Sequence, residues 1–340
     1  MPRRVIAMAS RLFGFAATLL GASLITFAIS HLIPNDPARL AAGDGASLEV
    51  VAQMREALGL DRPIWEQYLR YLDALLGGDL GISIRSGEPV LTELLRAAPA
   101  TIELALFALI LIVGASLTLG AVAAMNHNRP IDHVVRVVSA ISLSTPTFWS
   151  ALLLIGIVGL TLGWTPLGGR ASVEMDTPAV VTGLLVVDGL LAGRLDIVGD
   201  ALLHLILPAV TLAIAAWGGA VRLFRAALLD VLQQDFVRRA RAAGLSPWRI
   251  ATRYAAPPAL VPYTTAMGLT FADLLGGAVV TELIFNWPGL GAYTMQAIAG
   301  LDFPAIMGFT LLAAIVYASV NLVVDIVIGV IDPRTRSVRP

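Results

Sequence analysis

Six apolar runs, each about as long as a membrane-spanning helix, restrict the fold of this chain most strongly. A helix needs roughly 20 apolar residues to cross the hydrocarbon core of a bilayer. The composition agrees, because 57% hydrophobic and only 14% charged residues are atypical of a soluble domain. We therefore expect an all-α polytopic membrane protein with six transmembrane helices and an uncleaved first span. The runs occupy residues 12–32, 104–125, 137–162, 201–221, 255–280 and 304–330.

The arginines indicate how these helices cross the membrane. They gather before the first run, between the second and third, between the fourth and fifth, and after the sixth. Positively charged residues concentrate in cytoplasmic segments, so these four segments are predicted to be cytoplasmic. Residues 34–100, by contrast, contain more acidic residues than arginines. Both termini should therefore face the cytoplasm.

The predicted organisation has three parts. Residues 1–33 contain the cytoplasmic N-terminus and the first span, and residues 101–340 form a five-span core. Between them, residues 34–100 should form a small helical extracytoplasmic segment, because 48–60 and 63–78 repeat apolar residues every three or four positions. Whether this segment only links two spans or also binds an external partner stays open.

One shorter apolar run competes for the role of a seventh span. Residues 178–193 are apolar but are interrupted by Asp188 and Gly189. A span there would place the arginines between the fourth and fifth runs outside the cell. We therefore expect an external helix that lies at the membrane interface.

Two amino acids are missing from the chain, and their absence excludes several kinds of chemistry. Without cysteine there is no disulfide framework and no thiolate metal site, and the four histidines are scattered. Without lysine there is no Walker-type phosphate loop, Schiff-base lysine or Ser-Lys dyad. We expect no metal or cofactor in this chain. Any energy that this protein uses must come from elsewhere.

The arginine-rich stretch 235–257 combines helix and turn signals. Residues 235–243 contain no helix breaker, and Gly244 then predicts a left-handed stop. Ser246 and Pro247 predict the N-cap and the first position of a second helix.

The second predicted helix carries a cationic face. Arg249 and Arg253 are four residues apart, and Pro257 and Pro258 are expected to end the helix. A basic cytoplasmic loop needs no such defined geometry. A short cationic helix along the membrane surface suits a groove of another protein.

The sequence "RRARAAGLSPWRIATRYAAP" (238–257) resembles the EAA motif of ATP-binding-cassette (ABC) importer permeases, with Gly244 and Pro257 at its glycine and proline. Arg238 and Arg239 depart from its nominal Glu-Ala, as is familiar in the branch that imports dipeptides, oligopeptides and nickel. That branch typically has the form Tyr-x-Arg-x-Ala-Arg-Ala-x-Gly-Leu. The corresponding residues here are "FVRRARAAGL" (236–245), with Phe236 in place of the tyrosine. Other blocks are similar to the same branch: "HLIPNDPA" (31–38), "LGLDRPIWEQYLRYLDALLGGDLGISIRSGEPV" (58–90), "HLILPAVTL" (204–212), "GGAVVTELIFNWPGLG" (276–291) and "VNLVVDIVIGVIDPR" (320–334).

This resemblance implies the first permease subunit of a bacterial or archaeal plasma-membrane importer, with the type I ABC importer permease fold. Its partners would be a second, non-identical permease, two ATPase subunits, an extracytoplasmic solute-binding protein and membrane lipid, but no nucleic acid. ATP and Mg would be bound by the ATPase subunits, so the chain itself would not be an enzyme. Di- and oligopeptides are the expected substrates. Nickel chelates, glutathione or another small solute remain alternatives.

In this family, the segment that matches 240–257 is the coupling helix, which sits in a cleft of the ATPase. The resemblance therefore implies that Gly244 makes the turn and that Leu245 to Arg253 form the docking surface. The predicted ATPase-coupling residues are Arg238, Arg241, Gly244, Leu245, Ser246, Pro247, Arg249, Arg253 and Pro257.

The third and fifth runs supply candidates for the translocation path. Hydroxyl groups there either line a passage or pack helices together. A carboxylate at the depth of Asp273 costs about 2.5–3.5 kcal/mol, so it should face an aqueous cavity or a partner. It would either attract the ammonium group of a peptide or bond to the second permease; family members usually have a small residue at this place. The candidates are Ser142, Ser144, Thr145, Thr147, Thr270 and Asp273.

Two other function classes are alternatives to an ABC permease. A proton-coupled secondary transporter would use Asp273 as its carrier site, and inhibition of uptake by vanadate separates it from an ATP-driven importer. An intramembrane enzyme would need paired catalytic residues within the spans, and no Ser/His or Asp/Asp pair is evident.

Overall fold

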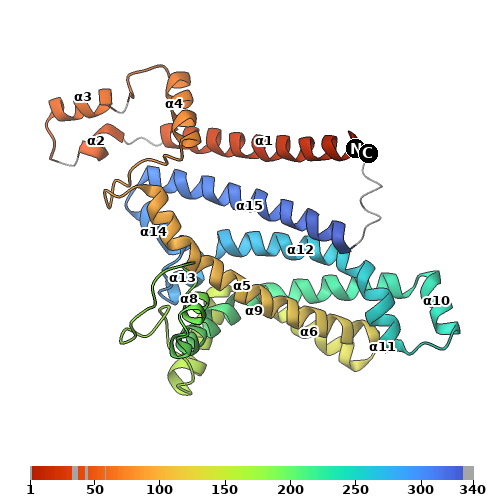
Figure 1. Cartoon of the computed structure of the whole chain (residues 1–340). Helices are drawn as coiled ribbons and strands as arrows, with labels where there is room; N and C mark the ends of the chain where they lie inside the picture. The colour runs from red at the N-terminus through yellow and green to blue at the C-terminus, as the bar shows by residue number, and fades with distance from the viewer. Residues whose placement is uncertain (1, 33–36, 43–44, 58, 332–340) are drawn as a thin grey trace. The chain divides into compact units, whose positions relative to one another are not determined.

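The computed structural model describes residues 2–32, 37–42, 45–57 and 59–331 (Figure 1). Within these ranges the regular structure is helical, apart from an isolated β-bridge between Ile82 and Pro89. The all-helical prediction is therefore confirmed. The predictions for residues 33–36 and for the arginines after residue 331 lie outside the described residues.

The described helices vary widely in length, and two short ones are π-helices. In chain order they are α1 (Pro2–Leu32), α2 (Pro37–Ala42), α3 (Leu48–Ala57), α4 (Ile64–Leu76), α5 (Val90–Met125), α6 (Pro130–Ser144), α7 (Thr147–Leu154), the π-helix η1 (Ile155–Thr161), α8 (Leu185–Leu191), α9 (Leu195–Leu232), α10 (Asp235–Ala242), α11 (Pro247–Arg249), the π-helix η2 (Ile250–Ala255), α12 (Ala256–Gly277), α13 (Val279–Ile284), α14 (Leu290–Ala299) and α15 (Phe303–Ile331).

Three described stretches of helix are long and apolar enough to cross a membrane: Val90–Met125, Leu195–Leu232 and Phe303–Val324. A fourth is possible if α6 is joined to the helix that follows it. The other predicted runs coincide with α1, whose apolar part is Phe13–Ala28, and with α12. The chain is thus polytopic in character.

The third predicted run is not one straight helix. α6 and the helix after it meet at an angle of 101°. Proline disfavours helical backbone in the residue before it, and Thr145, which precedes Pro146, is extended with φ −87° and ψ 120°. The hydroxyl of Thr145 donates to the carbonyl oxygen of Ile141 at 2.7 Å and so satisfies an acceptor freed by the break. The run 137–162 is therefore a bent pair of helices, and its role as one membrane span stays a prediction.

Of the described residues, those within 2–98 and 293–318 form one compact unit. In it, α1 contacts α4 through an aromatic cluster of Phe27, Tyr68 and Tyr71. The hydroxyl groups of Ser23 and Tyr68 are 3.0 Å apart and add a hydrogen bond to this contact. Both helices predicted within residues 34–100 are present, as α3 and α4.

Of the described residues, those within 99–292 and 319–331 form the second compact unit, which is built around α9. α9 contacts α6, α7, α8 and α12 (Figure 1). The contact with α6 is close at Gly218, where an added Cβ would lie 2.3 Å from the carbonyl oxygen of Ser139. Only glycine allows these two helices to approach so closely.

We expect Gly218→Ala to destabilise the second unit by about 1–3 kcal/mol, because the methyl group would push α6 away from α9. Gly199→Ala is the matched control, since Gly199 lies on the same helix and an added Cβ there meets nothing within 4 Å. The control should be neutral or slightly stabilising, because alanine favours a helix by about 1 kcal/mol over glycine. Thermal unfolding of both variants in detergent tests this, and equal stabilities would contradict it.

The run 178–193 folds as a loop followed by the short helix α8. Asp188 is 4% exposed, and its carboxylate accepts hydrogen bonds from the backbone N–H groups of Val181, Thr182 and Gly183 and from the Thr182 hydroxyl. Burial alone would raise the pKa of Asp188, but these four hydrogen bonds lower it below its ordinary value. The run is thus held as a compact turn and is too short to span a membrane, as predicted.

Candidate functional site

The segment between α9 and α12 has the predicted helix, glycine and second-helix order. α10 ends at Ala242, and Gly244 has a left-handed backbone with φ +76°. Ser246 caps the next helix, because its hydroxyl accepts the N–H of Arg249 at 3.4 Å. Pro247 occupies the first position. The predictions for the turn and the cap are confirmed.

The predicted end of the second helix is wrong. α11 passes through η2 directly into α12, and Pro257 lies in the first turn of α12 instead of ending a helix. A proline is tolerated at this junction, because local π-type bonding can re-satisfy the backbone groups that its missing N–H leaves free. The chain crosses the junction with a π-type bond from the N–H of Ala256 to the carbonyl of Ala251.

A small apolar core holds α10 against η2. Val237 and Ile250 are almost completely buried, and Leu232 and Leu245 pack against them. We call α10, the turn at Gly244, α11 and η2 (residues 235–255) the hairpin. Leu245 is half-buried inside the hairpin, so its side chain is only partly available for docking. The other eight predicted coupling residues are exposed: Arg238, Arg241, Gly244, Ser246, Pro247, Arg249, Arg253 and Pro257.

Trp248 is an additional exposed residue at the tip of this hairpin. Its side chain is 62% exposed between Pro247 and Arg249. Tryptophan is enriched among residues that dominate protein interfaces. From the sequence, Trp248 was predicted only as part of the docking range Leu245 to Arg253. A lone tryptophan among polar residues of a turn could have indicated an exposed residue that binds a partner.

A cavity of about 540 Å³ lies beside the hairpin, where the ends of α5 and α9 meet α10 and η2. The polar side chains that line it are His127, Gln233, Arg238 and Arg241. The guanidinium of Arg241 also donates to the carbonyl of Leu232 at 3.4 Å. The hairpin is thus connected to the ends of two long helices, so a displacement of the hairpin would be transmitted to them.

A buried ion pair secures the loop between α5 and α6 to α9. Asp132 is 0% exposed and receives two hydrogen bonds from Arg225, at 2.6 and 2.7 Å. The backbone N–H of Asn128 donates a third at 3.0 Å. From the sequence, Arg225 is recognisable only as one of the arginines that indicate topology, because its partner lies 93 residues earlier.

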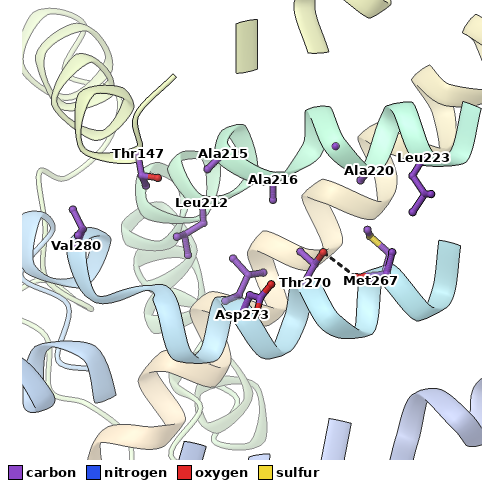
Figure 2. Close-up of a pocket in the computed structure, with 13 residues that line it drawn as sticks. Thr147, Leu212, Ala215, Ala216, Ala220, Leu223, Met267, Thr270, Asp273 and Val280 are labelled. Atoms are coloured by element: carbon purple, nitrogen blue, oxygen red, sulfur yellow. Dashed lines mark hydrogen bonds between the residues drawn. The ribbon is translucent and has the colours of Figure 1, made fainter. Parts of the chain in front are cut away.

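A second cavity, of about 390 Å³, lies between α9 and α12 (Figure 2). Thr147, Thr270 and Asp273 all line this cavity, so the structure brings together these three predicted residues of the translocation path. The remaining wall is mostly apolar: Leu212, Ala215, Ala216, Gly219, Ala220, Leu223, Ala266, Met267, Leu274 and Val280.

The other three predicted path residues lie elsewhere. Ser142 and Thr145 line a separate cavity, and the hydroxyl of Ser142 donates to the carbonyl of Ile214. Ser144 is exposed and donates to the carbonyl of Ala140 at 3.0 Å. Their hydroxyls thus satisfy backbone carbonyls around the bend.

The turn at residues 285–291, "FNWPGLG", is fixed by buried hydrogen bonds. Trp287 is 1% exposed, and its indole N–H donates to the carbonyl of Ala100 at 2.9 Å. Glu282, which is fully buried, accepts the hydroxyl of Thr101 at 2.6 Å. The turn is therefore anchored to α5, and its predicted place at the external mouth stays a prediction.

Known proteins resemble this chain over almost its whole length. Residues 116–337 match the family described as "Binding-protein-dependent transport system inner membrane component". Residues 5–105 match a second family, described as the N-terminal part of a binding-protein-dependent transport system membrane component. The probable D,D-dipeptide transport system permease protein DdpB of Escherichia coli (strain K12) is 47% identical over 95% of both chains. The dipeptide permease DppB of the same strain is 39% identical over 94% of this chain and 95% of its own. The glutathione permease GsiC of Escherichia coli O6:H1 is 33% identical over 96% and 97%, respectively.

Proposed function

We propose that this chain, which belongs to the family of binding-protein-dependent transport system inner membrane components, forms half of the membrane path of an ATP-driven importer of di- and oligopeptides. The observation that carries the proposal is the match over nearly the full length to permeases of peptide transport systems. The hairpin between α9 and α12 supports it, because it presents an exposed cationic surface on a defined turn.

The proposed topology has six spans, with α6 and the helix after it counted as one bent span and with both termini in the cytoplasm. The arginine distribution supports this orientation. The hairpin would then lie on the cytoplasmic side, where an ATPase subunit could bind its exposed arginines. Closure of the ATPase pair would move the hairpins together and open the path outward, as a rigid-body change.

The proposed complex contains a second permease, two ATPase subunits and an external solute-binding protein. ATP and Mg would be bound by the ATPase subunits. Peptides are the favoured substrates, because two of the relatives are named for dipeptides. Glutathione, itself a tripeptide, is the second candidate, since one similar permease is named for it.

Reconstitution of the complete transporter in proteoliposomes tests this function. We expect uptake of a radiolabelled dipeptide only when ATP is inside the vesicles with the ATPase subunits and the loaded binding protein is outside, and we expect vanadate to stop it. Uptake without ATP that ceases when the proton gradient is dissipated would contradict the proposal and favour a proton-coupled carrier.

A further inference from the structure

The cavity between α9 and α12 contains one ionisable side chain among its described lining residues, the carboxylate of Asp273. Thr270 precedes it by three positions on α12 and therefore lies on the same face. Figure 2 shows both side chains on the side of α12 that borders α9, whose small residues Ala216 and Ala220 leave the space open. Thr147 faces the same cavity from the start of α7.

Asp273 differs from the buried carboxylates of this unit in having no partner. Asp132 and Glu103 each pair with an arginine, and Asp188 and Glu282 accept hydrogen bonds from hydroxyl and backbone N–H groups. Within the described residues, Asp273 has neither an ion pair nor a hydrogen bond, and it is exposed. Its charge is therefore available to a group that enters the cavity.

The chemistry of the cavity selects a cation. Mostly apolar walls weaken the screening of a charge, so a carboxylate there attracts an ammonium group more strongly than it would in water. An ammonium carries three donors. The oxygens of Asp273 can accept two of them, and the hydroxyl oxygen of Thr270 can accept another while its proton remains bonded to the carbonyl of Ala266 at 3.0 Å.

We infer that Asp273, with Thr270 and Thr147, forms a transient binding site in the permease for the terminal ammonium group of a peptide that is being transported. This inference rests on the proposed function. It adds a selectivity step within the membrane, after release from the binding protein: a substrate with a free amino group is stabilised in the cavity, and a blocked or anionic one is not. The cavity volume of about 390 Å³ suits a small peptide end rather than a long chain.

The test compares Asp273→Asn with wild type in the reconstituted transporter, at saturating loaded binding protein. The substrates are alanyl-alanine and lactoyl-alanine, in which a hydroxyl group replaces the amino group. We expect Asp273→Asn to lower the maximal uptake rate of alanyl-alanine about fivefold, equivalent to about 1 kcal/mol, and to leave lactoyl-alanine unchanged. Asp273→Glu should stay within about twofold of wild type, because it keeps the charge.

The matched control is Asp230→Asn, which removes an exposed carboxylate from α9 outside the cavity and should change neither rate. Equal losses for both substrates in Asp273→Asn would overturn the inference and indicate an ion pair with the second permease. No loss for either substrate would also overturn it. If wild type imports no peptide at all, the proposed function fails instead.

A second measurement does not depend on the selectivity of the binding protein. A hydrophobic carbodiimide modifies accessible carboxyl groups in membranes, and mass spectrometry reports modification of Asp273 directly. In the solubilised complex held outward-facing by vanadate, we expect millimolar alanyl-alanine to slow modification of Asp273 and lactoyl-alanine to leave it unchanged. Equal modification with both compounds would overturn the inference.

Discussion

The Gly244→Val substitution is expected to leave the chain in the membrane and to lower ATP-dependent uptake about tenfold to a hundredfold. Gly244 has φ +76°, a conformation that costs a β-branched residue about 1–3 kcal/mol. An added Cβ at this position meets nothing within 4 Å, so the effect comes from the backbone and not from a clash. The strained turn would misplace Trp248 and Arg249, four and five residues later, on the proposed ATPase-binding surface.

Three measurements separate uncoupling from misfolding. The amount of permease in the membrane and its assembly with partners should match wild type, and basal ATP hydrolysis should continue while its stimulation by loaded binding protein is lost. Gly244→Asn is the control, because asparagine tolerates this conformation, and its uptake should stay within about threefold of wild type. Normal uptake by Gly244→Val would show that this turn does not couple ATP hydrolysis to transport.

Asp132→Ala is expected to lower the free energy of unfolding in detergent by about 3–5 kcal/mol, because it removes the carboxylate that pairs with the charge of Arg225. The Arg225 side chain is only 15% exposed, so water compensates the loss poorly. The same carboxylate accepts the N–H of Asn128, so the loop before α6 would lose its anchor as well.

Asp235→Ala provides the contrast. It removes an ion pair with Arg238 in which both side chains are more than 70% exposed, and such pairs contribute about 0–1 kcal/mol. The double variant Asp132→Ala with Arg225→Met should recover part of the loss, because it removes the unpaired charge together with its partner. A loss below about 1 kcal/mol in Asp132→Ala would mean that water or another group replaces the carboxylate.

Local features of the hairpin were predictable from neighbouring residues. Gly244 stops a helix and Ser246 with Pro247 starts one, and both signals act over a few positions. The interpretation of Pro257 failed because a proline near a helix end is compatible either with the end of one helix or with the first turn of the next. Only the continuation of η2 into α12 distinguishes these two cases.

The site in the membrane was predictable only in part. Asp273 was identified by its charge in an apolar run, and its depth implied a cavity or a partner. The hydroxyl residues of the third run could not be sorted in the same way, because Pro146 interrupts it. On the two sides of this bend, Thr147 faces one cavity and Thr145 another.

The sequence alone determined that this chain is helical, enters a membrane and belongs with ABC importer permeases, because runs of apolar residues, capping residues and motifs are local properties. The tertiary structure decided which distant groups meet: Asp132 with Arg225, Gly218 with Ser139, and Thr147 with Asp273 in one cavity. These contacts depend on the bend between α6 and α7 and on the packing of α6 and α12 against α9. Such geometry arises from many side chains together and is not specified by any short stretch of residues.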